Sequence, residues 1–168
     1  MIDPSREISR IIVEQMRVED LDEVMIIEKN SFLTPWTKGM FMEELNKTQS
    51  ICLVAKIPHD SGFERRQKVV GFVCSSFVID ELHILNIAVH PSYRRRGIAT
   101  LLMEEVIKRG YKKGIRYIFL EVRIRNKAAI SLYEKLGFRI VGLRRGYYSD
   151  TGEDALIMEK EIKGLGDI

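Results

Sequence analysis

Hydrophobic and polar positions along the chain follow two alternating patterns, which predict a series of strands and helices. Apolar runs rich in Val, Ile and Leu predict strands over 10–17, 50–57, 69–79, 82–89, 116–123, 138–147 and 153–162. Apolar residues spaced three and four apart predict helices over 19–32, 37–47, 97–112 and 126–136. The polar segment 58–68, which contains Pro, Asp, Ser and Gly, predicts a hairpin loop.

Local signals at two helix ends support this assignment. Thr37 is a suitable N-cap for the second helix, and Gly137 suits the C-terminal end of the fourth. The order β, α, α, β, β, β, α, β, α, β, β predicts an α/β fold, in which helices cover the faces of a mixed sheet. The chain has 168 residues without a repeat or a linker, so we expect a single domain over 1–168.

Composition narrows the class of protein. Hydrophobic residues make up 45% of the chain and charged residues 30%, which suits a folded domain and excludes general disorder. Uncharged stretches such as 69–79 are too short to cross a bilayer, and 1–10 lacks the apolar run of a signal peptide. Cys52 and Cys74 lie in strand-like segments and are expected to be reduced core thiols. We therefore expect a cytoplasmic protein that has no membrane contact.

The segment from His90 to Thr100 follows an apolar strand and begins a helix, so it is a candidate phosphate site. Free backbone N–H groups and the positive end of the helix dipole suit an anion at such a place. Gly97 and Ala99 leave room for a pyrophosphate to approach the backbone, and the run Arg94 to Arg96 adds positive charge. The segment matches neither the P-loop nor the Gly-x-Gly-x-x-Gly pattern. On spacing alone, an ordinary capped helix start explains it equally well.

The same segment resembles a known motif, and further motifs extend the resemblance over 13–161. The pattern Arg94-x-x-Gly97-x-Ala99 after a strand resembles the acetyl-CoA motif of the GNAT acetyltransferase superfamily. Within it, the chain resembles the acetyltransferases that modify the N-terminal alanine of a ribosomal protein and the archaeal amino-terminal acetyltransferases. The other motifs are, in this order, Leu85–Val89, Leu120–Arg123 with Asn126, Leu132–Phe138, and Gly146–Tyr148 followed by 152–155.

The resemblance implies the GNAT fold, in which a central pair of parallel strands splays apart and holds acetyl-CoA in the cleft. The backbone of Ile87, Ala88 and Val89 is then expected to pair with the pantetheine arm. The implied pyrophosphate site consists of Arg94, Arg95, Arg96, Gly97, Ile98, Ala99 and Thr100. Asn126 is implied to hydrogen-bond the pantetheine, although a role as the N-cap of the following helix explains it equally well and is compatible.

Glu121 is the candidate general base. Alternation along its strand places it on one face with Tyr117 and Phe119. A carboxylate among aromatic neighbours must be paired, exposed at a cleft, or raised in pKa by desolvation. A paired or edge-exposed glutamate is the purely structural explanation. The resemblance implies instead that Glu121 takes a proton from a substrate amine, directly or through a water.

Tyr133 shares a helix face with Ala129, Leu132 and Leu136, so a core position would explain it. The resemblance implies that its hydroxyl reaches the sulfur of acetyl-CoA and donates a proton to the leaving thiolate. The amine is then expected to attack the thioester directly, without an acyl-enzyme. In that reaction the two cysteines take no part.

Aromatic residues in two segments are candidates for the wall that binds the acceptor. The resemblance implies that Tyr147 and Tyr148 cover the first residues of a peptide and that Phe32 and Trp36 form the opposite wall. Packing would explain the two tyrosines as well. Glu28 interrupts the apolar face of the first helix and is a candidate to receive the amine, but we expect it to tilt toward the surface.

The resemblance, together with these residues, implies an acetyl-CoA-dependent enzyme that acetylates the α-amine of a protein N-terminus of the Ala or Ser type, on a ribosomal protein or a nascent chain. An α-amine has a pKa near 8 and a lysine amine near 10.4, so neutral lysine costs about 3.4 kcal/mol more at pH 7. Acetylation of lysine, a polyamine or another small amine is the enzymatic alternative, and acetyl-CoA sensing without turnover is the non-enzymatic one. We expect no nucleic-acid role, because no aromatic stacking platform accompanies the arginines. The three histidines lack metal-ligand spacing, so no metal is predicted.

Overall fold

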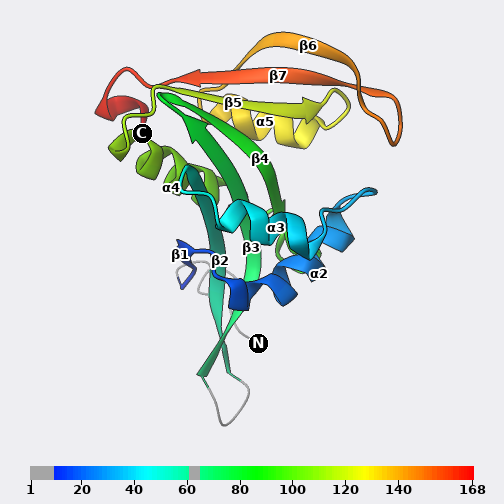
Figure 1. The fold of residues 1–168 in the computed structure, drawn as a ribbon, viewed down its shortest axis with the longest axis vertical. Coiled ribbons are helices and arrows are strands. Elements are labelled where there is room, and N and C mark those ends of the chain that lie inside the picture. Colours follow the sequence, from blue (N-terminus) through cyan, green and yellow to red (C-terminus); the bar gives the residue numbers. More distant parts are fainter. Residues whose placement is uncertain (1–9, 61–64) are drawn as a thin grey trace.

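A seven-stranded sheet runs through the part of the chain that the computed structural model describes, residues 10–60 and 65–168 (Figure 1). Its strands are β1 (Ile12–Gln15), β2 (Ser50–Asp60), β3 (Arg65–Val78), β4 (Glu81–Val89), β5 (Tyr117–Arg123), β6 (Arg139–Tyr148) and β7 (Glu153–Glu161). They lie in the order β1-β2-β3-β4-β5-β7-β6, and the pairing is antiparallel except between β4 and β5, which are parallel. The predicted mixed sheet is therefore confirmed.

Helices cover both faces of the sheet, as predicted. In the described residues they are α2 (Leu21–Ser31), α3 (Lys38–Leu45), α4 (Ile98–Lys112) and α5 (Lys127–Lys135), with short 3-10 turns at Val18–Asp20, Pro91–Tyr93 and Leu165–Asp167. In Figure 1, α2 and α3 lie across one face of β2, β3 and β4, and α4 lies behind them. Thr37 caps α3 as expected, because its hydroxyl accepts a hydrogen bond from Met40 N at 3.2 Å. None of the helices in these ranges has the length and apolar character that a membrane span requires.

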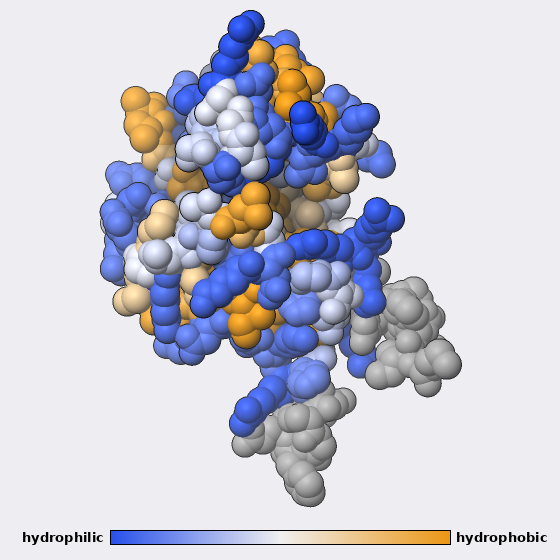
Figure 2. Space-filling view, turned by 90° about the vertical axis from the view of Figure 1, so that its right-hand side faces the viewer, coloured by the Kyte–Doolittle hydropathy of each residue, from blue (hydrophilic) through white to orange (hydrophobic). Residues whose placement is uncertain are grey.

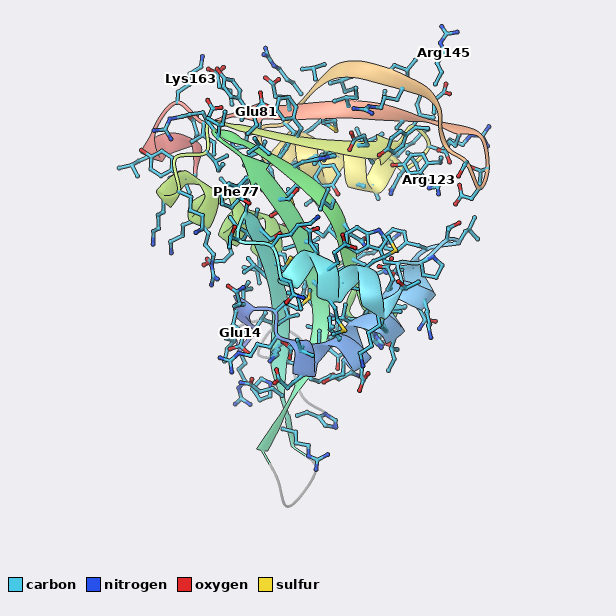
Figure 3. All side chains as sticks on the ribbon, viewed as in Figure 1. Glu14, Phe77, Glu81, Arg123, Arg145 and Lys163 are labelled. Atoms are coloured by element: carbon cyan, nitrogen blue, oxygen red, sulfur yellow. The ribbon has the colours of Figure 1, made fainter. Side chains whose placement is uncertain are left out.

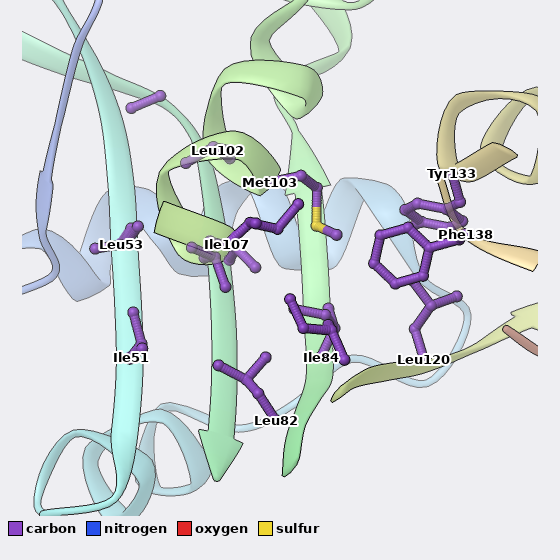
Figure 4. Packing of buried hydrophobic residues seen from close by; sticks show 14 of the residues in the cluster. Ile51, Leu53, Leu82, Ile84, Leu102, Met103, Ile107, Leu120, Tyr133 and Phe138 are labelled. Carbon is purple, nitrogen blue, oxygen red and sulfur yellow. The ribbon is translucent and has the colours of Figure 1, made fainter. Parts of the chain in front are cut away.

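Two hydrophobic cores hold the helices on the sheet. Figure 4 shows the larger core, in which Leu102 and Met103 of α4 pack with Leu82 and Ile84 of β4. The smaller core lies under α2 and α3, and its buried members are Met16, Leu21, Val24, Ile27, Phe41, Cys52, Val54, Val69, Phe72, Cys74 and Ala88. Full burial of a large apolar side chain contributes about 1.5–3 kcal/mol, so these cores decide which face of each helix points inward.

The β2–β3 hairpin extends further than the polar pattern predicts. Pro58 pairs with Gln67 and His59 pairs with Arg66, so the prediction of a loop was wrong for 58–60 and 65–68. Residues 61–64, the rest of that predicted loop, lie outside the described residues. Strand formation here depends on backbone pairing with a neighbour, which overrides the loop preference of individual polar residues.

A β-bulge in β4 reverses the faces to which its side chains point. The register with β3 pairs Ile84 with Ser75 but Asn86 with Cys74, so Leu85 is the extra residue. Because side chains alternate along a strand, one extra residue exchanges the two faces. Ile84 consequently belongs to the core under α4, whereas Ala88 belongs to the core under α2 and α3.

The β3–β4 turn contains a strained residue whose replacement should stabilise the protein. Ile79 has φ of 58°, and its side chain is 87% exposed. The left-handed region costs an L residue about 1–2 kcal/mol, and a β-branched side chain is especially unfavourable there. Ile79→Gly removes this strain without loss of packing, and we expect a net gain of about 0.5–1 kcal/mol after the extra unfolded-state entropy of glycine.

Equilibrium unfolding in urea would measure this gain. The matched control is Val78→Gly at the neighbouring position, which is also exposed but lies at the end of β3 and should lose stability. A decrease in unfolding free energy for Ile79→Gly would contradict the expectation.

Candidate active site

β4 and β5 pair over a short stretch and then separate. Their parallel register in the described residues runs from Glu81 opposite Tyr117 to His83 opposite Phe119. Beyond this point they enclose a cavity of about 420 Å³, whose walls include 84–87 of β4 and 120–123 of β5. Figure 2 views this side of the molecule, where the surface is hollowed between its upper and lower parts. The predicted splayed pair of parallel strands is therefore confirmed.

The cavity brings together predicted site residues from several distant segments. The predicted residues that line it are Phe32, Trp36, Ile87, Glu121, Asn126, Tyr133, Tyr147 and Tyr148. Ala88 and Val89 continue β4 beyond its walls and lead toward α4. The candidates for catalysis and for acceptor binding thus share one space, and the candidates for pyrophosphate binding follow at the end of β4. Across 10–60 and 65–168, no group of three or more His, Cys, Asp or Glu side chains is placed to hold a metal ion.

The start of α4 presents free backbone amides next to open space. Arg95 and Gly97 have φ of 61° and 81°, both in the left-handed region, and Gly97 is the N-cap. The first backbone hydrogen bond of the helix runs from the Leu101 amide to Gly97 O, at 3.1 Å. The amides of 98–100 come before it and therefore have no acceptor within the helix. A Cβ at Gly97 would meet no heavy atom within 4 Å, which leaves the approach to these amides open. This end of α4 therefore fits an anionic group.

The arginines before α4 also have structural contacts that the sequence did not indicate. Arg94 donates from Nε to Val89 O at 3.1 Å and from Nη2 to Ser31 Oγ at 3.2 Å. It thereby connects the loop after β4 to the C-terminal end of α2. The guanidinium of Arg96 lies 5.2 Å from the centroid of the Tyr93 ring. Positive charge is thus held close to the first turn of α4.

Glu121 is paired with two basic side chains. His83 Nε2 hydrogen-bonds Glu121 Oε2, and Arg144 Nη2 lies 3.5 Å from Glu121 Oε1. Burial raises the pKa of the Glu121 carboxyl and is the largest single effect. The hydrogen bond and charge of His83, with the charge of Arg144, together outweigh it and bring that pKa below its ordinary value. Glu121 is therefore ionised at neutral pH.

Sequence reasoning missed His83, because the partner of Glu121 comes from another strand. Alternation within β5 was visible in the sequence, whereas the parallel register that places His83 opposite Phe119 was not. The His83 side chain is 41% exposed, so its imidazole connects the less exposed Glu121 carboxylate with solvent.

Tyr133 and Asn126 reach the cavity from α5 and its N-cap. Burial, with a smaller effect of the Tyr148 phenol, raises the pKa of Tyr133 to about 12, so Tyr133 keeps its proton at neutral pH. Asn126 Oδ1 accepts a hydrogen bond from Ala129 N at 3.2 Å, which is the N-cap role that the sequence allowed. Asn126 also lines the cavity, so its expected contact with pantetheine remains a prediction.

The two tyrosines at the end of β6 are held by an arginine that sequence reasoning did not single out. The guanidinium of Arg123, labelled in Figure 3, lies 4.0 Å from the centroid of the Tyr148 ring. Its Nη2 donates to Asp150 Oδ2 at 2.7 Å, and its Nη1 lies 3.4 Å from Glu153 Oε1. Tyr147 meets Tyr148 edge to face, with 5.1 Å between ring centroids. Arg123 therefore orders this wall of the cavity from the end of β5.

Glu28 lies inside the protein, so the expectation that it tilts toward the surface was wrong. It is 1% exposed, and it lines the cavity at the wall formed by α2. Its Oε1 accepts a hydrogen bond from Trp36 N and its Oε2 accepts one from Asn86 Nδ2, both at 2.9 Å. Burial raises the pKa of the Glu28 carboxyl, and these two hydrogen bonds only partly oppose that effect. Helical periodicity could not reveal this burial, because the loop after α2 and strand β4 contribute to it.

Comparison with known proteins identifies the family that has this arrangement. Residues 21–138 match the model of the "Acetyltransferase (GNAT) family". The chain belongs to the GNAT acetyltransferase family. This result agrees with the resemblance drawn from the sequence motifs, and the protein is accordingly an N-acetyltransferase.

Relatives of this GNAT protein are similar to it over nearly their whole length. The [ribosomal protein bS18]-alanine N-acetyltransferase of Escherichia coli (strain K12) is 34% identical over 154 residues, which cover 89% of this chain and 97% of the relative. The crystal structure of the E. coli ribosomal-protein-S18-alanine N-acetyltransferase has a TM-score of 0.79 at 33% identity and covers 93% of this chain and 96% of its own.

Two further relatives come from different organisms. A Bacillus subtilis (strain 168) protein to which the bS18-alanine N-acetyltransferase name is given provisionally is 37% identical over 150 residues, 89% of this chain and 95% of its own. The N-alpha-acetyltransferase of Saccharolobus solfataricus is 32% identical over 161 residues, 87% of this chain and 90% of its own.

The pairing of Glu121 with His83 predicts a shift that can be measured directly. In His83→Ala the hydrogen bond and charge that lower the pKa of Glu121 are lost while burial remains, so we expect this pKa to rise. Carbon-13 NMR of labelled glutamate carboxyls, followed as a function of pH, would measure the change. His90→Ala is the control, since His90 hydrogen-bonds Ser92 N in the turn after β4. An unchanged Glu121 titration in His83→Ala would contradict the assignment.

Proposed function

We propose that this GNAT enzyme transfers the acetyl group of acetyl-CoA to the α-amine of protein N-termini of the Ala or Ser type, on a ribosomal protein or a nascent chain. The observation that carries the proposal is that Glu121, paired with His83, and Tyr133 line one cavity between diverging strands. The names of the E. coli and S. solfataricus relatives support an α-amine as acceptor. Such acceptors are made in the cytoplasm, and the proposal places the protein there as one domain over 1–168.

Residues of β4 and of the α4 N-terminus would hold acetyl-CoA. When bound, acetyl-CoA supplies the thioester whose acetyl group the amine accepts directly, without an acyl-enzyme. The backbone of 87–89 lies beyond the stretch of β4 that pairs with β5, so it can bond the amides of a pantetheine arm. The amides of 95–100 and the charge of Arg94, Arg95 and Arg96 suit a pyrophosphate. Asn126 can contact the pantetheine while it caps α5.

Glu121 and His83 would act together on the proton of the substrate amine. A protonated α-amine has a pKa near 8, well above that of Glu121, so the carboxylate alone is a weak base for it. Glu121 can nevertheless hold the ammonium group and receive its proton transiently, directly or through a water. His83 Nε2 donates its hydrogen bond to the ionised carboxylate, and because the imidazole is partly exposed, the proton taken up by Glu121 can pass to the solvent beside it.

Tyr133 would stabilise the leaving sulfur by hydrogen bonding. A phenol with a pKa of about 12 is a weaker acid than a thiol, whose pKa is about 8.5. Complete proton transfer from Tyr133 to the thiolate is therefore uphill, whereas a hydrogen bond from the retained proton stabilises the charge that develops on sulfur. This argument modifies the role of proton donor that the family resemblance implied.

The electrostatics of the cavity favour an α-amine over a lysine. Deprotonation of a lysine amine at pH 7 costs about 3.4 kcal/mol more than that of an α-amine, and a carboxylate with a lowered pKa cannot offset this difference. An enzyme that acetylates lysine or a small amine would have the same cofactor site and a different acceptor wall. The assay described below distinguishes this alternative from the proposed function. Acetyl-CoA sensing without turnover does not require an ionised carboxylate in the cavity, whereas proton transfer from an amine does.

Release of thiol from acetyl-CoA in the presence of short peptides tests the acceptor. Peptides that differ only in their first residue should react when the α-amine is free and should not react when it is blocked, with a preference for Ala or Ser. Glu121→Gln should lower kcat/KM by about 10²-fold or more, because it cannot accept the proton.

Each result of this assay bears on one part of the proposal. Equal reaction of blocked peptides that contain lysine would overturn the α-amine acceptor. Binding of acetyl-CoA without any turnover of free peptides would favour the sensing module. Unchanged turnover by Glu121→Gln would remove Glu121 from the mechanism.

The hydrogen-bonding role of Tyr133 predicts a defect in kcat. Tyr133→Phe keeps the ring that packs against Phe138 and loses only the hydroxyl, so kcat should fall by about 10²-fold while acetyl-CoA affinity stays close to wild type. Steady-state kinetics and equilibrium binding of acetyl-CoA would separate the two effects. If kcat is unchanged, Tyr133 is a core residue only.

A further inference from the structure

Glu28 connects two parts of the acceptor side of the cavity that are distant in sequence. One carboxylate oxygen accepts from the backbone amide of Trp36, in the loop between α2 and α3, and the other accepts from the side chain of Asn86 on β4. Both bonds are 2.9 Å long, and the Glu28 side chain is almost fully buried. A buried carboxylate with two good hydrogen bonds has little freedom to move, so both partners are fixed relative to each other.

The bulge in β4 is what brings Asn86 to this place. Without the extra residue Leu85, alternation would turn the side chain at position 86 toward α4, as it turns Ile84. With the bulge, Asn86 faces α2 and meets Glu28. The same stretch of β4 lines the cavity next to the point where the strand leaves β5. The Glu28–Asn86 bond thus joins α2 to the strand segment that shapes the site.

The Trp36 amide lies in the loop whose side chains form the wall opposite the β6–β7 hairpin. Phe32 and Trp36 both line the cavity, and the Trp36 ring packs on Phe41 of α3 with 5.1 Å between centroids. The loop between α2 and α3 spans six residues, 32–37, without regular structure. Its position at the cavity therefore depends on few bonds, of which the Glu28–Trp36 bond is one.

From this geometry we infer that Glu28 is a positioning residue for the acceptor: it holds the Trp36 loop against the bulge of β4 and so sets the shape of the wall that contacts the first residues of the peptide. The role of the wall in peptide binding rests on the proposed function, whereas the position of the loop does not. A carboxylate suits this place because both groups that face it are N–H donors, the backbone amide of Trp36 and Nδ2 of Asn86, and a carboxylate accepts from both.

Reversal of the hydrogen-bond polarity provides a specific test. In Glu28→Gln the new amide can accept from Trp36 N, but its NH₂ group then faces Nδ2 of Asn86, a donor–donor contact that only a rotation of the Asn86 amide relieves. Asn86→Asp alone places two carboxylates face to face. In the double variant Glu28→Gln/Asn86→Asp, the amide can accept from Trp36 N and donate to the new carboxylate, so both bonds are restored with the charge of the pair unchanged.

Trp36 reports the position of the loop without any need for catalysis, because it is the single tryptophan in the sequence. We expect a red-shifted emission and stronger acrylamide quenching in Glu28→Gln, and recovery of both in the double variant. The matched control is Glu23→Gln, since Glu23 is another carboxylate of α2 that accepts a backbone amide, Val69 N at 2.9 Å, away from the cavity. That control should leave the emission of Trp36 unchanged.

Kinetics with a reactive peptide then test the consequence for the acceptor. Loss of one buried hydrogen bond should raise the peptide KM of Glu28→Gln by about tenfold, with little change in kcat or in acetyl-CoA affinity, and the double variant should recover. A purely structural role would lower the melting temperature without this selective change in KM and without rescue.

The outcomes separate this inference from the proposed function. If wild-type protein fails to acetylate any peptide, the proposed function fails, and the fluorescence of Trp36 still decides the role of Glu28. If wild type is active but Glu28→Gln keeps the wild-type emission and KM, or the double variant shows no recovery, the positioning role of Glu28 is overturned.

Discussion

The early separation of β4 from β5 is the constraint on which the site depends. Neighbouring strands normally continue their hydrogen-bond ladder, because unpaired backbone groups in a protein interior are costly. Here the ladder ends at His83, and the bulge at Leu85 follows directly. The sheet therefore retains an internal gap with free strand edges. An extended ligand that contains amide groups can complete these edges, as we propose for the pantetheine arm of acetyl-CoA.

The bulge also determines which side chains meet across the gap. Before it, His83 meets Glu121, and after it, Asn86 meets Glu28. The two carboxylates consequently have opposite electrostatic environments. Burial raises the pKa of both carboxyls, but at Glu121 the interactions with His83 and Arg144 outweigh it and lower the pKa, whereas at Glu28 two neutral donors oppose it only in part and the pKa is raised. This difference supports the proposed division of roles, in which Glu121 takes part in proton transfer and Glu28 holds the acceptor wall.

The parts of the protein assigned to the two substrates are physically connected. Arg94, in the loop before α4, hydrogen-bonds Ser31 at the end of α2, and Glu28 one turn earlier holds the Trp36 loop. On the opposite side, Arg123 links the end of β5 to Tyr148 in the β6–β7 hairpin. The walls of the cavity are therefore fixed by a few charged side chains. Such contacts orient flexible segments more precisely than apolar packing alone.

The sequence by itself determined the order of strands and helices, the cap of α3 and the segment before α4, because these depend on local periodicity and turn chemistry. Its motifs also indicated the GNAT family and Glu121, Tyr133 and Asn126 as site residues. Tertiary structure decided the partners of these residues. Strand register brought His83 to Glu121, the bulge brought Asn86 to Glu28, and neither has a local signature in the chain. Contacts of this kind arise from pairing between distant segments, which no single segment encodes.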